Sequence, residues 1–117
     1  MSVKETEVGK SVYVGTAFNL NTAPFTVLKL NFTNPDGVTK FSRTDSADGI
    51  TAPAVDSPSL PNVGILPANT YMLYKTQATD FALGSAGDWK LCSEYEDAAP
   101  SKFFGDDTVL TVEKACD

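Results

Sequence analysis

Residues 25–37, FTVLKLNFTNPDG, carry the clearest structural pattern in the chain. In an extended chain Leu30 and Phe32 fall on one face of this stretch, and Lys29 and Asn31 fall on the other. A dry face opposite a wetter face is typical of a half-buried antiparallel strand. The closing letters NPDG place a proline and a glycine at positions that a tight turn favours. We therefore predict a strand that ends in a β-turn.

The chain on either side of this stretch has the same character. Residues 38–44 return as a second strand, so residues 25–44 are predicted to form a β-hairpin. Further strands are predicted at residues 12–14, 17–20, 70–75, 88–95 and 102–114. One helical turn is predicted at residues 79–83, with Thr79 as its N-cap. About seven short strands in a single domain, residues 11–117, indicate an all-β fold, an immunoglobulin-like antiparallel β-sandwich.

Two segments stand apart from this pattern. Residues 1–10 are charged, and we expect them to form an N-terminal arm that orders on assembly. Residues 45–68 contain four prolines and are predicted to form a long loop that carries Val63, Ile65 and Leu66. These three apolar side chains either plug the end of the core or form a contact for a protein partner. All three are therefore candidate interface residues.

Aromatic side chains supply a second candidate surface. Phe103 and Phe104 are consecutive on a predicted strand, so one should face the core and the other should face away. An outward phenylalanine at the edge of a sheet suits an anchor for a protein partner, and we take both as candidate interface residues. Trp89 shares a strand face with Leu91 and Tyr95, which places it in the core.

Composition excludes several classes of function. The 117 residues fit one domain, and the net charge of −6 leaves no cluster of Lys and Arg for a nucleic acid or an anionic membrane, so neither partner is expected. Histidine is absent, which excludes Ser–His and Cys–His nucleophiles within this chain. Asp106 and Asp107 are adjacent, so on a strand they point to opposite faces and cannot share a proton. We expect neither catalysis nor a cofactor.

Metal binding and disulfide formation find little support in the sequence. Calcium prefers oxygen ligands, but the spacing of the loop aspartates matches no EF-hand, and we expect no metal at Asp36, Asp45, Asp48 or Asp56. Cys92 and Cys116 are predicted to lie about ten residues apart along paired strands, on the order of 33 Å at ~3.3 Å per residue. A disulfide needs Cα atoms within about 7 Å, so both cysteines are expected to be free thiols.

Export and membrane insertion are not predicted either. No apolar run approaches the roughly 20 residues that a membrane-spanning helix needs. The start of the chain is charged where a signal peptide has an apolar core. We expect the chain to be synthesised as a cytoplasmic product.

Five motifs, taken in order, resemble a known family. They are VYVG at 12–15, LKLNFTNPDG at 28–37, TYMLYKT at 70–76, TDFALGSAGDWKL at 79–91 and KFFGDDTVLTV at 102–112. Together they resemble the small immunoglobulin-like structural proteins of tailed bacteriophages and the amino-terminal module of phage baseplate upper proteins. The resemblance covers about two thirds of the chain, and the segment at 45–68 departs from it by being longer and richer in proline.

This resemblance implies a virion building block of the tail, neck or baseplate. Such a protein docks onto neighbouring virion proteins, is made in the host cytoplasm, is present in many copies in the particle and has no catalytic residues. Two alternatives stay open. One is a capsid decoration or cement protein on the phage head. The other is a carbohydrate-binding module that uses Tyr71, Tyr74 or Phe104 as stacking platforms, although Tyr71 and Tyr74 have opposite parity on a strand.

Overall fold

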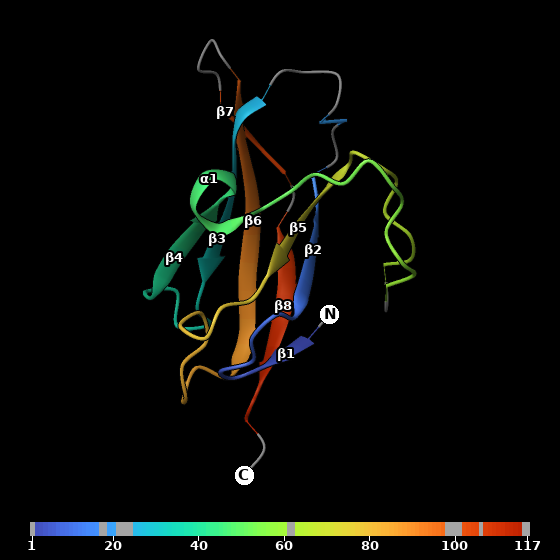
Figure 1. Ribbon diagram of the computed structural model, residues 1–117. Helices are drawn as coiled ribbons and strands as arrows, with labels where there is room; N and C mark the ends of the chain where they lie inside the picture. The colour runs from blue at the N-terminus through green and yellow to red at the C-terminus, as the bar shows by residue number, and fades with distance from the viewer. Residues whose placement is uncertain are drawn as a thin grey trace.

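The computed structural model describes residues 2–16, 19–20, 25–60, 63–97, 102–105 and 107–115. Within these residues the chain forms eight strands and one short helix, so the prediction of an all-β fold is confirmed (Figure 1). The elements are β1 (Ser2–Lys4), β2 (Ser11–Gly15), β3 (Phe25–Thr33), β4 (Lys40–Thr44), α1 (Asp45–Asp48), β5 (Tyr71–Lys75), β6 (Gly87–Asp97), β7 (Lys102–Phe104) and β8 (Thr108–Glu113).

The strands form two sheets. Six of them make one sheet in the order β1-β8-β6-β3-β4, and β7 pairs with β6 beyond the end of β8. All pairs in this sheet are antiparallel except β1 with β8, which run parallel. The other sheet consists of β2 and β5, which are antiparallel. The long central strand β6 therefore organises the larger sheet, with partners along both of its edges (Figure 1).

The predicted hairpin at residues 25–44 is confirmed. β3 and β4 pair antiparallel, and the Asn34 N–H donates to the Thr39 carbonyl at 2.8 Å to close the turn. Asp36 stabilises the turn because its carboxylate accepts from the N–H groups of Val38 and Thr39, at 2.7 and 3.0 Å. Gly37 lies in the left-handed region, with φ of 75°, which a side chain would disfavour.

Residues from both sheets share one hydrophobic core. Leu30 and Phe32, on the predicted dry face of β3, are fully buried, and Trp89 is 2% exposed, so both predictions are confirmed. The Trp89 indole N–H donates to the Ser85 carbonyl at 2.9 Å, and the ring meets Phe81 edge-on with centroids 5.1 Å apart. The small sheet contributes the buried side chains of Val12, Val14, Met72 and Tyr74. Burial of these apolar side chains in one core is the main force that holds the two sheets together.

The single helical turn was predicted at the wrong place. Among the described residues it lies at α1, where the Thr44 side chain accepts from the Ala47 N–H at 3.3 Å and Gly49 ends the turn in the left-handed conformation. The segment predicted to be helical, residues 79–83, forms turns instead. Its Asp80 carboxylate accepts from the Gln77 N–H at 2.8 Å, and such a local side-chain bond competes with helix formation.

The structure also differs from the predicted strands near both ends of the chain. The segment at 102–114 is divided into β7 and β8, with Leu110 and Val112 facing the core as expected. Residues 17 and 18 of the strand predicted at 17–20 lie outside the described residues, and the prediction is wrong for residues 19 and 20, which do not form a strand. Residues 2–4, expected to belong to an arm, pair with β8 in this structure, and Val3 is 2% exposed.

Cys92 is a free thiol next to the Gly105 carbonyl, and Cys116 lies outside the described residues.

Candidate interaction surfaces

A proline-rich lobe, residues 53–69, of which the structure describes 53–60 and 63–69, projects to one side of the sheets (green to yellow in Figure 1). Its base is closed by two backbone hydrogen bonds of 2.9 Å, from the Ser57 N–H to the Leu66 carbonyl and from the Asn69 N–H to the Pro53 carbonyl. The buried Ser57 hydroxyl also accepts from the Leu66 N–H at 2.8 Å. The two arms of the lobe are therefore joined by both backbone and side chain.

Two further hydrogen bonds stabilise the lobe, one within it and one to the sheet, and the first involves the only charged residue of the lobe. The Asp56 carboxylate accepts from the Ala68 N–H at 2.9 Å, and the Tyr71 hydroxyl donates to the Val55 carbonyl at 2.9 Å. Asp56 is the single charged residue in the whole stretch 49–74. The lobe thus presents a constrained and nearly uncharged surface on an acidic protein.

The three candidate residues of the lobe differ in exposure. Val63 and Ile65 are 58% and 59% exposed, and Val55 in the same lobe is 66% exposed. Leu66 is half-buried, and its side chain would lie 3.6 Å from a Cβ placed on Gly15. The interpretation of this loop as a plug for the core is wrong for Val63 and Ile65, because both side chains are more than half exposed. It applies in part to Leu66.

The two phenylalanines of β7 form the second candidate surface. Phe103 stacks on Tyr95 with ring centroids 5.7 Å apart and meets Phe25 edge-on at 6.4 Å, while Phe104 pairs across the sheet with Glu94. Phe103 remains 37% exposed and Phe104 57% exposed. The expectation that one of them enters the core is therefore wrong. β7 has only three residues, and all three are exposed among the residues that the structure describes.

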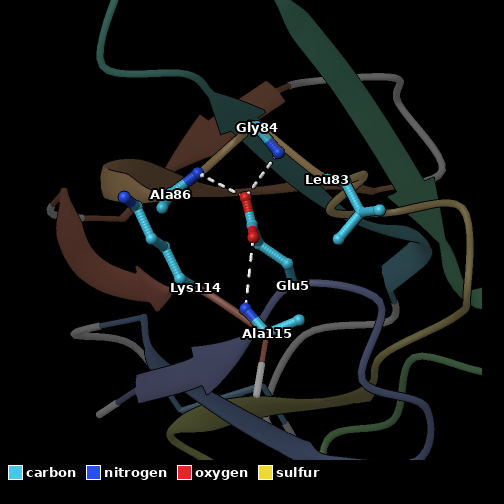
Figure 2. A pocket seen from close by; sticks show the side chains of 6 residues that line it. All are labelled: Glu5, Leu83, Gly84, Ala86, Lys114 and Ala115. Atoms are coloured by element: carbon cyan, nitrogen blue, oxygen red, sulfur yellow. Dashed lines mark hydrogen bonds between the residues drawn. The ribbon is translucent and has the colours of Figure 1, made fainter. Parts of the chain in front are cut away.

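A buried carboxylate occupies a third place, near the end of β1. Glu5 is 5% exposed, and its carboxylate accepts from the N–H groups of Ala115, Gly84 and Ala86 at 3.2, 2.6 and 3.1 Å (Figure 2). These donors, Ala115 first, lower the pKa of Glu5 despite the opposing effect of burial. Glu5 therefore ties the start of the chain to the 84–86 turn and to the residue that follows β8 by two.

A shallow pocket of about 380 Å³ opens over this carboxylate (Figure 2). It is lined by Glu5, Leu83, Gly84, Ala86, Lys114 and Ala115. Both carboxylate oxygens already accept hydrogen bonds from the backbone, so the group that could have held a ligand is engaged within the fold. We interpret the site as a structural clamp.

Arg43, the only arginine of the chain, lies in a network centred on Asp80. Its Nε donates to the fully buried Asp80 carboxylate at 2.9 Å, and a second guanidinium nitrogen makes a shorter contact with the same oxygen. The carboxylate also accepts from the Tyr74 hydroxyl at 2.6 Å and from the Gln77 N–H. Burial and the Asp80 bond raise the pKa of Tyr74, so this hydroxyl stays protonated and keeps donating. This network is a structural ion pair between the hairpin and the 77–80 turn.

The loop aspartates considered for calcium are dispersed and used locally. Asp36 closes the hairpin turn, Asp45 accepts from the Leu28 N–H, Asp48 accepts from the Thr44 N–H, and Asp56 holds the lobe. Over the part of the chain that the structure describes, no group of three or more Cys, Asp and Glu side chains is placed to bind a metal. Within the same residues, no helix is long and apolar enough to cross a membrane.

The two tyrosines considered as carbohydrate platforms are not available for stacking. Tyr71 is 2% exposed and Tyr74 is fully buried, and both hydroxyls bond within the fold. Opposite parity on β5 therefore does not leave one ring outside: the Tyr71 hydroxyl bonds to Val55 in the lobe, and Tyr74 belongs to the core. Phe104 alone among the three is exposed.

Sequence reasoning missed the two polar clusters described above. Glu5 lies in a segment whose charges suggested an arm, and nothing in the local pattern shows that its donors are Gly84, Ala86 and Ala115, which lie 79, 81 and 110 residues away. The occurrence of a single arginine in the chain was a usable signal for Arg43, because guanidinium groups favour buried pairs with carboxylates.

Comparison with known proteins identified no family for this chain. No model of a protein family matches the chain, and no curated protein matches it at a significant level. What remains for a functional interpretation is the chemistry of the surfaces and the motifs of the sequence.

Proposed function

We propose that this chain is a non-catalytic assembly module of a bacteriophage particle, an immunoglobulin-like sandwich that docks onto neighbouring virion proteins of the tail, neck or baseplate. The observation that carries the proposal is the proline-rich lobe, which holds Val55, Val63 and Ile65 exposed on a hydrogen-bonded base. Three exposed apolar side chains on one short lobe suit a contact with another protein, because such a contact would remove their apolar surface from water.

The construction of the lobe favours binding over chance exposure. Binding is weakened by the entropy lost when a flexible loop becomes ordered, and the bonds of Ser57, Asp56 and Tyr71 reduce this loss in advance. Because the only carboxylate of the lobe is already bonded to its own backbone, the contact would depend on apolar burial and vary little with salt. Phe103 and Phe104 offer a second apolar contact away from the lobe.

The assignment to a phage particle is supported by the five motifs that resemble phage tail and baseplate proteins. The motif at 28–37 forms the hairpin turn, and the Trp-containing motif at 79–91 leads into the central strand. Weak single contacts suffice in a particle, because many copies bind together and avidity multiplies their effect.

Immunogold electron microscopy of purified phage particles, with an antibody against this chain, tests the proposal. Label at the neck or tail tip supports it. Label over the capsid would favour the alternative of a decoration or cement protein, with the lobe as a capsid contact. An antibody that finds the protein free in the lysate and labels no particle would overturn the virion role.

A further inference from the structure

The first strand is held by few backbone pairs at the edge of the larger sheet. β1 has three residues and pairs in parallel with β8, with Ser2 opposite Thr111 and Val3 opposite Val112 (Figure 1). Val3 is nevertheless almost fully buried and belongs to the core. Removal of this strand would therefore expose apolar surface and the edge of β8, which a strand of the same sequence would cover again.

Glu5, the residue after β1, is held by a specific set of hydrogen-bond donors. The Glu5 carboxylate fills a cradle of three backbone N–H groups, from Ala115, Gly84 and Ala86, and is 5% exposed there (Figure 2). We call residues 2–5 the exchange segment. β8 and the three N–H donors would pair in the same way with the exchange segment of another copy, because that segment has the same sequence and presents the same groups.

The connection from the exchange segment to β2 is short and strained. It runs over residues 6–10 and contains two residues with positive φ, Thr6 at 64° and Gly9 at 79°. A β-branched residue such as Thr6 is a rare occupant of the left-handed region, because its side chain crowds the backbone. Thr6 is held there by its N–H, which donates to the Phe81 carbonyl at 2.7 Å. Short hinges under strain favour the exchange of elements between copies.

We propose that two copies of this chain exchange residues 2–5, so that the exchange segment of each copy pairs with β8 of the other and places Glu5 in the other copy's cradle. Each copy then has the same strand pairing, the same Glu5 hydrogen bonds and the same burial of Val3 as before the exchange. The difference is that the hinge at Thr6 and Gly9 can open. Reciprocal exchange gives a closed, two-fold dimer. This inference does not depend on a role in a phage particle, since its partner is the chain itself.

A disulfide between adjacent residues of β1 and β8 tests the proposal. The S2C/T111C variant, in a chain whose own cysteines are replaced by serine, is oxidised at increasing protein concentrations and run on a non-reducing gel. We expect a covalent dimer whose fraction rises with concentration. T33C/K40C serves as the control, because these residues pair within one hairpin and should link only within a chain. Links confined to the monomer at every concentration would overturn the proposal, and unlinked thiols would overturn it too, because β1 would then not pair with β8.

The strain at the hinge gives a second and independent readout. In the background of the same cysteine pair, T6G should lower the dimer fraction about five- to tenfold, since glycine accepts the left-handed conformation without the steric penalty. Asn69 has a φ of 63° in the lobe, far from the hinge, so N69G is the matched control and should leave the fraction unchanged. A dimer fraction that T6G leaves equal to that of N69G would refute the role of the strained hinge.

Discussion

Asp80→Ala is the substitution that tests the polar network most directly. In the folded protein the Asp80 carboxylate is fully buried and accepts from Arg43, from the Tyr74 hydroxyl and from the Gln77 N–H. Alanine would leave the guanidinium of Arg43, whose side chain is only 20% exposed, without its buried counter-ion. It would also leave the Tyr74 hydroxyl, in a fully buried residue, without an acceptor.

The magnitude follows from these orphaned groups. Breaking a buried ion pair by removing one partner costs about 3–5 kcal/mol, and a single buried donor without an acceptor accounts for about 1–3 kcal/mol. Water can reach part of the Arg43 side chain, which places the expected loss at about 3–4 kcal/mol in the free energy of unfolding. A domain of this size has about 5–15 kcal/mol in total, so the variant should fold but only marginally.

Urea unfolding monitored by the fluorescence of Trp89, the only tryptophan, measures this loss. With a slope of about 1.5 kcal/mol per M, the midpoint should fall by about 2 M or more. Asp107→Ala is the control: its contact with Lys90 is 3.8 Å long and both side chains are more than half exposed. The control should lose less than about 1 kcal/mol. A loss for Asp80→Ala no larger than for Asp107→Ala would show that the Asp80 network does not stabilise the fold.

Three further predictions concern the core, the lobe and the clamp. Trp89→Ala should cost about 3–5 kcal/mol by thermal or urea denaturation followed by circular dichroism, and a loss below about 1 kcal/mol would contradict its place in the core. V63S/I65S should leave the melting temperature within a few degrees of the parent but reduce incorporation into particles, scored by immunoblot, whereas V38S, which alters an 82% exposed residue of the hairpin turn, should change neither. The pKa of Glu5 is lowered by folding, so its contribution to stability is present above the ordinary glutamate pKa of about 4.5 and disappears as the pH falls through the lower folded-state pKa. Glu5→Gln should therefore flatten the acid side of the curve of melting temperature against pH, and an unchanged acid side would argue against the clamp.

Local pattern was sufficient for much of the fold. The alternation in β3 and the NPDG turn predicted the hairpin at 25–44, and the parity of β6 predicted the burial of Trp89. Period-two alternation is reliable where one face of a strand is buried, because a shift of one residue would expose the whole apolar set. The helical turn was misplaced because α1 has only four residues and its cap resembles the Thr-Asp sequence at 79–80. So short an element carries no periodicity of its own.

The candidate sites depended more on tertiary placement. Val63 and Ile65 were identified as apolar residues in a loop, but their exposure depends on bonds at the base of the lobe. Phe103 and Phe104 were correctly seen as consecutive on a strand. The sequence could not show that both rings would remain partly exposed, because that depends on how other parts of the chain pack around β7.

Composition and local periodicity account for the all-β class, the hairpin, the apolar faces of the main strands and the lack of histidine chemistry, because these depend on residue types and on contacts between near neighbours. Three other features depend on how the whole chain packs: Arg43 meets Asp80, Glu5 enters a cradle built from distant parts of the chain, and Thr6 takes a left-handed conformation. A buried charge must find its partner wherever the packed sheets bring one, and that position is a property of the whole fold. The local sequence pattern therefore does not predict which residue will be the partner.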